Sequence, residues 1–235
     1  MFNRLPSLPT EFDLPYTDDQ PVDNELQWLA PHLLRAILLL AWGERYDWFM
    51  GVNLGVYYDP DLPAIGPDAF LSLGVPRFRD NGQLRLSYLV WQENNVMPQW
   101  VLEIVSKKPG GEYDEKMTIY RDMGVLYYVI FNPDYWQRDG HEPFEVYQLQ
   151  DGQYVRQLQN PVWMPEINLG IGMEMGSHEG GQLRQWLYWY DQQGQRLPAP
   201  ENVIETERQR AEQAEQQIQE LKELLRSRGI NPDQR

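Results

Sequence analysis

Short apolar runs separated by two helical patterns constrain the fold of this chain most. Residues 26–43 carry apolar residues at helical spacing, and residues 113–123 form an amphipathic pattern that stops at Gly124. The other runs are aromatic and β-branched, which is typical of strands. They cover residues 48–58, 68–73, 84–92, 99–105, 126–131, 144–149 and 154–158. The order helix, strands, helix, strands predicts an α/β or α+β fold, with a mixed central sheet flanked by helices.

Cap and turn residues mark the expected limits of some elements. Asp23 or Asn24 is the expected cap of the first helix, although Pro31 favours a start at the proline itself. The Asp-Gly pair at residues 151–152 lies between two strand-like runs. This pair predicts a β-hairpin.

The chain changes composition near its end. Residues 201–228 contain no glycine, proline or aromatic residue, and their apolar residues follow an alternating four-and-three spacing. This pattern predicts a coiled-coil-prone helix, with a homodimer as a possible consequence, although alanines in the seam weaken it. We therefore expect an extended arm over 1–24, a globular domain over 25–197, and a linker with a C-terminal helix over 198–235.

Composition excludes several classes of protein. The chain carries 20 basic and 35 acidic residues, a net charge of −15, which argues against a polyanion binder with a broad basic surface. It has no cysteine, so disulfides, zinc–thiolate sites and cysteine nucleophiles are impossible. No pair of its three histidines has the spacing of a helical zinc site. No stretch has the length of a membrane span or the apolar core of a signal peptide, so we expect a cytoplasmic protein without a membrane partner.

Two acidic residues stand in surroundings that are wrong for acids. Asp68 precedes the apolar run AFLSL, and Glu103 lies within WVLEIV. A carboxylate buried in such a strand needs a partner, and a divalent cation is one. Two carboxylates and a backbone carbonyl would leave positions on Mg²⁺ for a phosphate oxygen and a water molecule. Taken singly, Glu103 fits an edge position and Asp68 fits a turn.

Three lysines follow Glu103 closely and could complete such a site. Lys107 and Lys108 fall in the loop SKKPGGEY, whereas Lys116 falls on the second predicted helix. Tyr120 follows Lys116 by one turn on the same face. A lysine beside a metal can orient water or stabilise the charge on a phosphate. In isolation, Lys116 also fits a solvated helix position.

Four segments in this order carry a resemblance to a known family. They are GPDAF, PQWVLEIVS, EYDEKMTIY and GVLYYVIFNP. Together they resemble the Uma-two family of restriction endonucleases, also catalogued as a domain of unknown function, over about residues 15–195. The resemblance implies a restriction-endonuclease-like fold of the PD-(D/E)XK type. It also implies metal-dependent hydrolysis of DNA phosphodiester bonds.

The resemblance assigns roles to individual residues. Asp68 and Glu103 match the two acids of the family, and with the carbonyl of Ile104 they would hold Mg²⁺ or Mn²⁺. The usual lysine position, two residues after the glutamate, holds Val105. The lysine of this family lies on the following helix, which points to Lys116.

Two further residues are left as alternatives. Lys107 could replace Lys116, because the family's Ser-Pro-Ser-Thr stretch is Ser-Lys-Lys-Pro at residues 106–109. Glu25, near the start of the first helix, could be the extra acid found in some such nucleases.

The acidic composition is the main objection to a DNA-cleaving enzyme, because DNA binders usually have a basic face. Basic residues near the predicted site could form a local patch, namely Arg77, Arg79, Arg85, Lys107 and Lys108. The alternative hypothesis is a catalytically silent nuclease fold that acts as an interaction or assembly module through its C-terminal helix. A carbohydrate-binding sandwich is a third interpretation, but tryptophans in strands more often belong to a core.

Overall fold

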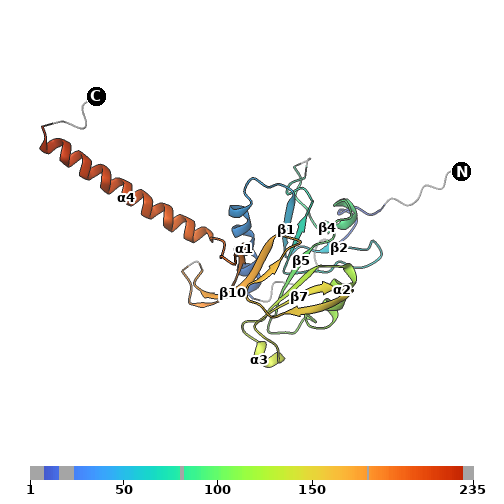
Figure 1. Cartoon of the computed structure of the whole chain (residues 1–235). Coiled ribbons are helices and arrows are strands. Elements are labelled where there is room, and N and C mark those ends of the chain that lie inside the picture. The colour runs from blue at the N-terminus through green and yellow to red at the C-terminus, as the bar shows by residue number, and fades with distance from the viewer. Residues whose placement is uncertain (1–7, 16–23, 80–81, 179, 230–235) are drawn as a thin grey trace.

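The computed structural model describes residues 8–15, 24–79, 82–178 and 180–229 (Figure 1). The helices are α1 (Leu26–Ala41), α2 (Glu115–Met123), α3 (Trp136–Asp139) and α4 (Pro200–Ser227). The strands are β1 (Trp48–Val52), β2 (Val56–Tyr57), β3 (Ala69–Leu73), β4 (Tyr88–Leu89), β5 (Trp100–Ile104), β6 (Tyr127–Phe131), β7 (Phe144–Gln150), β8 (Gln153–Gln157), β9 (Val162–Met164), β10 (Leu169–Gly176) and β11 (Arg184–Tyr190).

The central sheet has six strands in the order β1-β3-β5-β6-β7-β8. β5 and β6 run parallel, and every other neighbouring pair in this sheet is antiparallel. The predicted mixed α/β architecture is therefore confirmed. The hairpin predicted at residues 151–152 is also present, because β7 and β8 pair across it.

Alternation along β5 divides its side chains between the two faces of the sheet. Trp100, Leu102 and Ile104 belong to a core that also includes α1 and the three-stranded sheet β11-β10-β9. Val101 and Val105 belong to a second core, which includes the buried side chains of α2. Successive side chains of a strand point to opposite faces, so Glu103 faces α2.

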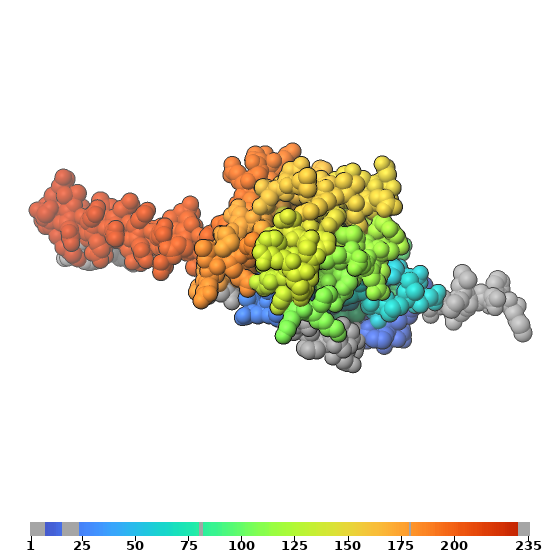
Figure 2. Space-filling view, turned by 90° about the horizontal axis from the view of Figure 1, so that it is seen from below, coloured from blue at the N-terminus to red at the C-terminus, as the bar shows by residue number. Residues whose placement is uncertain are grey.

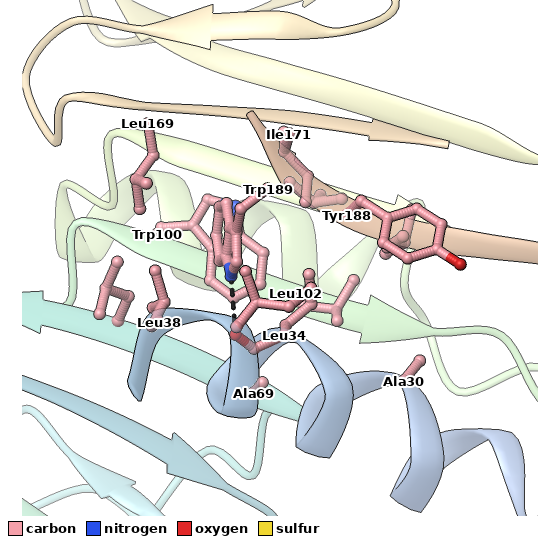
Figure 3. Packing of buried hydrophobic residues seen from close by; sticks show 14 of the residues in the cluster. Ala30, Leu34, Leu38, Ala69, Trp100, Leu102, Leu169, Ile171, Tyr188 and Trp189 are labelled. Carbon is pink, nitrogen blue, oxygen red and sulfur yellow. Dashed lines mark hydrogen bonds between the residues drawn. The ribbon is translucent and has the colours of Figure 1, made fainter. Parts of the chain in front are cut away.

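A pair of tryptophans joins the central sheet to the smaller sheet. Trp100 of β5 and Trp189 of β11 are fully buried, with ring centroids 4.9 Å apart. The indole N–H of Trp189 donates a hydrogen bond to the carbonyl of Leu34 at 3.0 Å (Figure 3). The smaller sheet and α1 thus form one continuous core with the central sheet. None of β9 to β11 was predicted from the sequence.

The first helix starts at residue 26, as its apolar pattern predicted, and the alternative start at Pro31 is wrong. Pro31 lies inside α1, in the second turn. The start is stabilised by Asn24, whose Oδ1 accepts the backbone N–H of Gln27 at 3.2 Å. Asp23, the alternative cap, lies outside the described residues.

The strand predicted over residues 84–92 is mostly absent. Only Tyr88–Leu89 is a strand, and Val90–Gln92 forms a 3₁₀ turn. The backbone N–H of Leu86 donates to the carboxylate of Glu11 at 3.1 Å rather than to a neighbouring strand. The guanidinium of Arg85 also donates hydrogen bonds to both carboxylate oxygens of Glu93. Side-chain partners have therefore replaced a sheet ladder in this segment.

The described part of the N-terminal arm, residues 8–15, contains no helix or strand. It lies against the body through two hydrogen bonds to its carbonyls. The indole N–H of Trp91 donates to Pro9 at 2.8 Å, and the hydroxyl of Tyr57 donates to Pro15 at 2.5 Å. The remainder of the arm predicted over 1–24 lies mostly outside the described residues.

α4 projects away from the rest of the molecule (Figures 1 and 2). The predicted C-terminal helix is present, and none of the described residues of α4 is buried. Among the described helices, none combines the length and the apolar character that crossing a membrane requires.

Truncation before most of α4 should leave the body stable. A chain ending at Thr206 loses most of α4, a helix without buried residues. We therefore expect its melting temperature to stay within about 2 °C of that of the full chain. Thermal unfolding followed by circular dichroism measures this. A fall of many degrees would show that α4 supports the core.

A methyl group at Gly51 should strain the strand that borders Asp68. A Cβ at this position of β1 would collide with the ring of Phe70, which is buried and packs against Tyr88. We expect Gly51→Ala to lower the free energy of unfolding by about 1–3 kcal/mol in urea titrations. Gly66→Ala is the matched control, because a Cβ there meets nothing within 4 Å. Equal stability of the two variants would contradict this packing.

Candidate active site

Asp68 and Glu103 lie next to each other on adjoining strands. Ala69 of β3 pairs with Leu102 of β5, so Asp68, one residue before β3, lies beside Glu103. The backbone N–H of Ile104 donates to Oδ2 of Asp68 at 2.6 Å. Both acids are buried, with 8% of Asp68 and 1% of Glu103 exposed. The two acids that the sequence singled out are thus brought together at one end of β5.

α2 supplies two partners for Glu103. Lys116 Nζ lies 2.7 Å from Oε2 of Glu103, and the hydroxyl of Tyr120 donates to Oε1 at 2.6 Å. Residues four apart on a helix share a face, so both side chains reach the same carboxylate. The helix begins two residues after the segment predicted, at Glu115, and stops before Gly124, which has a φ of 79°. This stop is a glycine C-cap.

Burial and mutual repulsion perturb the charges of this group. Burial raises the pKa of Asp68 well above its usual value, and the negative charge of Glu103 raises it further. Burial also raises the pKa of Glu103, although Lys116 and Tyr120 oppose the rise. Burial disfavours the charged ammonium of Lys116, but Glu103 and Asp68 outweigh this, so the pKa of Lys116 is raised. Lys116 is therefore an ammonium ion at neutral pH.

Glu112 is a further buried acid near the site, but it serves the loop before α2. The backbone N–H of Gly110 donates to both of its carboxylate oxygens, at 3.1 and 2.9 Å. Its carbonyl accepts the hydroxyl of Tyr128 at 2.7 Å. Its negative charge still raises the pKa of Asp68.

The other candidate residues do not contact the two acids. Lys107 and Lys108 are exposed, and the carbonyl of Lys107 accepts a hydrogen bond from Arg138 at 2.6 Å. Glu25 is exposed just before α1. The neighbouring Gln27 approaches the site instead, because its Nε2 lies 3.4 Å from the carbonyl oxygen of Ile104. Sequence reasoning missed Gln27, since a polar residue in the first turn of a helix carries no distinctive signal.

The oxygen atoms at this point suit a hard divalent cation. Carboxylate and carbonyl oxygens are the donors that Mg²⁺ and Mn²⁺ prefer, and Asp68, Glu103 and the carbonyl of Ile104 supply them. Burial, and then the negative charge of Glu103, raise the pKa of Asp68, and a bound cation would stabilise the charged carboxylate against both. In the described ranges, no three side chains of His, Asp or Glu gather as a metal site. The fit therefore depends on two carboxylates and one backbone oxygen.

The structure thus places two neighbouring buried acids on a mixed sheet, with a lysine of the next helix in contact with one of them. A family model, Uma2, described as "Putative restriction endonuclease", matches residues 2–175. The match spans most of the chain, and the protein belongs to this family.

Two other comparisons are less informative. A search of curated proteins finds no match. One solved structure with similarity is described as "a putative nuclease belonging to DUF820", from Anabaena variabilis. It shares 13% identity with this chain at a TM-score of 0.44, and the alignment covers 64% of this chain and 79% of the other.

Proposed function

We propose that this protein is a metal-dependent endonuclease that hydrolyses phosphodiester bonds of DNA. Asp68, Glu103 and the carbonyl of Ile104 would hold one Mg²⁺ or Mn²⁺ ion, and Lys116 would act beside it. The observation that carries the proposal is the pair of neighbouring buried acids at the end of β5, with an ammonium group 2.7 Å from one of them. Family membership supports a nuclease. A buried lysine–carboxylate pair can also serve stability alone. Such a pair needs only one acid, whereas this site holds two neighbouring acids.

The residues of the chain have separate tasks in this proposal. A bound divalent cation supplies Lewis acidity and lowers the pKa of water. Tyr120 holds one oxygen of Glu103, and the backbone N–H of Ile104 orients Asp68. Lys116 is charged, so it donates hydrogen bonds and stabilises an anionic phosphate instead of removing a proton.

The direct test is nicking of supercoiled plasmid DNA. We expect the full chain to produce open circles with Mg²⁺ or Mn²⁺ and to stop in excess EDTA. A protein that binds metal but leaves DNA intact would contradict the proposed function. Single-stranded DNA and RNA substrates in the same assay would define the nucleic acid class.

Replacing the site lysine should weaken cleavage strongly. Lys116→Gln removes a charge that lies 2.7 Å from Glu103, and we expect cleavage to fall about 10²–10³-fold. Lys107→Gln is the matched control and should leave the rate unchanged, because Lys107 is exposed in its loop. The reverse ranking would assign the role to Lys107.

A second candidate function follows from α4. Several apolar side chains on this helix are exposed, namely Ile204, Ile218, Leu221 and Leu224. They favour the alternative of an interaction or assembly module, with a homodimer as one outcome. The division into 1–24, 25–197 and 198–235, like the cytoplasmic location, stays a prediction.

A further inference from the structure

A pocket of about 500 Å³ lies beside the edge strand β1, away from the acids of the proposed site. Its wall combines α1, β1 and residues 77–79 and 82–85. Four arginines contribute to the lining, namely Arg35, Arg77, Arg79 and Arg85. A concentration of guanidinium groups is unexpected in a chain with a net charge of −15.

Two of these arginines already have carboxylate partners. Arg85 forms a two-pronged contact with Glu93, at 2.7 and 2.9 Å, and its guanidinium lies over the ring of Phe49. Arg79 pairs with Glu11 and lies 3.6 Å from Glu93. These pairs fix the wall of the pocket, and their charge is largely compensated.

The other two arginines are not compensated. Within the described ranges, no carboxylate lies at ion-pair distance from Arg35 or Arg77. The guanidinium of Arg77 lies 4.8 Å from the ring centre of Trp48, and its buried Nε has no hydrogen-bond partner there. Burial lowers the pKa of Arg35, and the charge of Arg77 lowers it further. Two like charges thus share a pocket in which they are partly removed from water, and a bound anion would stabilise both.

The pocket is connected to the proposed site through two elements. Gly51 and Val52 of β1 line the pocket, and the next backbone N–H, at Asn53, donates to the carbonyl of Asp68 at 3.1 Å. Along α1, Arg35 lies eight residues after Gln27, which contacts Ile104, a separation of about 12 Å. Phosphates of one DNA strand follow each other every 3.4 Å along the helix axis, so one strand could reach both places.

We propose that this pocket binds a phosphate group of the nucleic acid backbone, held between the guanidinium groups of Arg35 and Arg77. The assignment rests on the proposed function and extends it to the position of the substrate. A guanidinium offers a planar set of donors that matches the oxygens of a phosphate. The pocket also explains how an acidic protein can hold a polyanion, since attraction is needed only at this place.

The test is DNA binding without cleavage. Fluorescence anisotropy with a short labelled duplex in EDTA compares the full chain with Arg35→Gln and Arg77→Gln. We expect each variant to bind about tenfold more weakly and to lower the slope of log affinity against log salt by about one. Arg196→Gln is the matched control, because Arg196 pairs with Glu174 outside the pocket, and it should bind like the wild type.

Two measurements keep a folding defect from imitating this result. Arg35→Gln removes the repulsion between two like charges, so its melting temperature should not fall. If Arg77→Gln does not fold, the DNA binding of Arg35→Gln decides the test alone. Arg77→Lys keeps the charge and should bind DNA more tightly than Arg77→Gln. Equal DNA binding by wild type and Arg35→Gln would overturn the proposal.

Inorganic phosphate distinguishes the two sources of the ligand. Inorganic phosphate could raise the melting temperature of the wild type but not of Arg35→Gln, while the two proteins bind DNA equally. That result would show a site for a free anion and overturn the assignment to the nucleic acid backbone. Failure of the proposed function is separable. If the wild type binds DNA in EDTA more tightly than Arg35→Gln but produces no nicks with Mg²⁺ or Mn²⁺, the proposed function fails while the assignment of this pocket stands.

Discussion

Asp68→Asn should lower metal-dependent DNA cleavage by at least about a thousandfold, and Glu103→Gln should do the same. Each variant removes one of two carboxylates proposed to hold the cation, and a thousandfold corresponds to about 4 kcal/mol of transition-state stabilisation. Asparagine can still accept the N–H of Ile104 that now binds Asp68 at 2.6 Å. The fold should therefore survive, and the loss should belong to the chemistry.

Plasmid nicking under single-turnover conditions measures this effect, with thermal unfolding as the check on folding. Asp134→Asn is a suitable control, because Asp134 is an exposed acid that pairs with Arg184 away from β5. Its cleavage should match the wild type. Undiminished cleavage by either site variant would end the assignment of that acid.

Trp189→Ala should be the most destabilising single change in the core. Trp189 is fully buried beside Trp100 and donates to the carbonyl of Leu34, so its removal leaves a large cavity and takes away that hydrogen bond (Figure 3). Truncation of a buried tryptophan costs about 3–5 kcal/mol of unfolding free energy. The residue also joins the small sheet to α1, so both should lose packing.

Urea unfolding followed by circular dichroism checks this value. Trp28→Ala is the matched control, because Trp28 lies on α1 with 48% of its surface exposed and should cost far less. A change below about 1 kcal/mol for Trp189→Ala would mean that β9 to β11 are not part of the cooperative core.

The two acids could be identified from the sequence because their unusual apolar neighbours are adjacent to them in the chain. Glu103 is the single charged residue in the run QWVLEIV, and the alternation of that run places it on one face of a buried strand. The helix that carries Lys116 and Tyr120 has a clear amphipathic pattern and a glycine stop. Their mutual contacts depended on strand pairing, which was not visible in the sequence.

The three-stranded sheet β11-β10-β9 was not predicted from the sequence, for a physical reason. In β10, LGIGMEMG, every second residue is apolar, and three of the four residues between them are glycines, a pattern that weakens a strand prediction. A Cβ at Gly170 would approach Cβ of Tyr190 to 3.0 Å, and one at Gly172 would meet the ring of Tyr190 at 2.7 Å. The glycines therefore make room for a side chain of β11, a long-range relation that no local pattern reports.

The arginine pocket was predicted only in part. The sequence suggested that five basic residues could form a patch near the two acids. Arg77, Arg79 and Arg85 do line one pocket, but neither the two acids nor Lys107 and Lys108 line it. Arg35 was missed because it lies within an apolar helical stretch, where a single charge usually points to solvent. Its meeting with Arg77 comes from the packing of α1 beside β1.

The central claim is that Asp68 and Glu103 together bind one divalent cation. Calorimetric titration of Mn²⁺ into the full chain tests it most directly, with Asp68→Asn and Glu103→Gln as companions. The account predicts one site in the wild type and its loss in both variants. The absence of binding up to millimolar Mn²⁺, or binding that both variants retain, would contradict it.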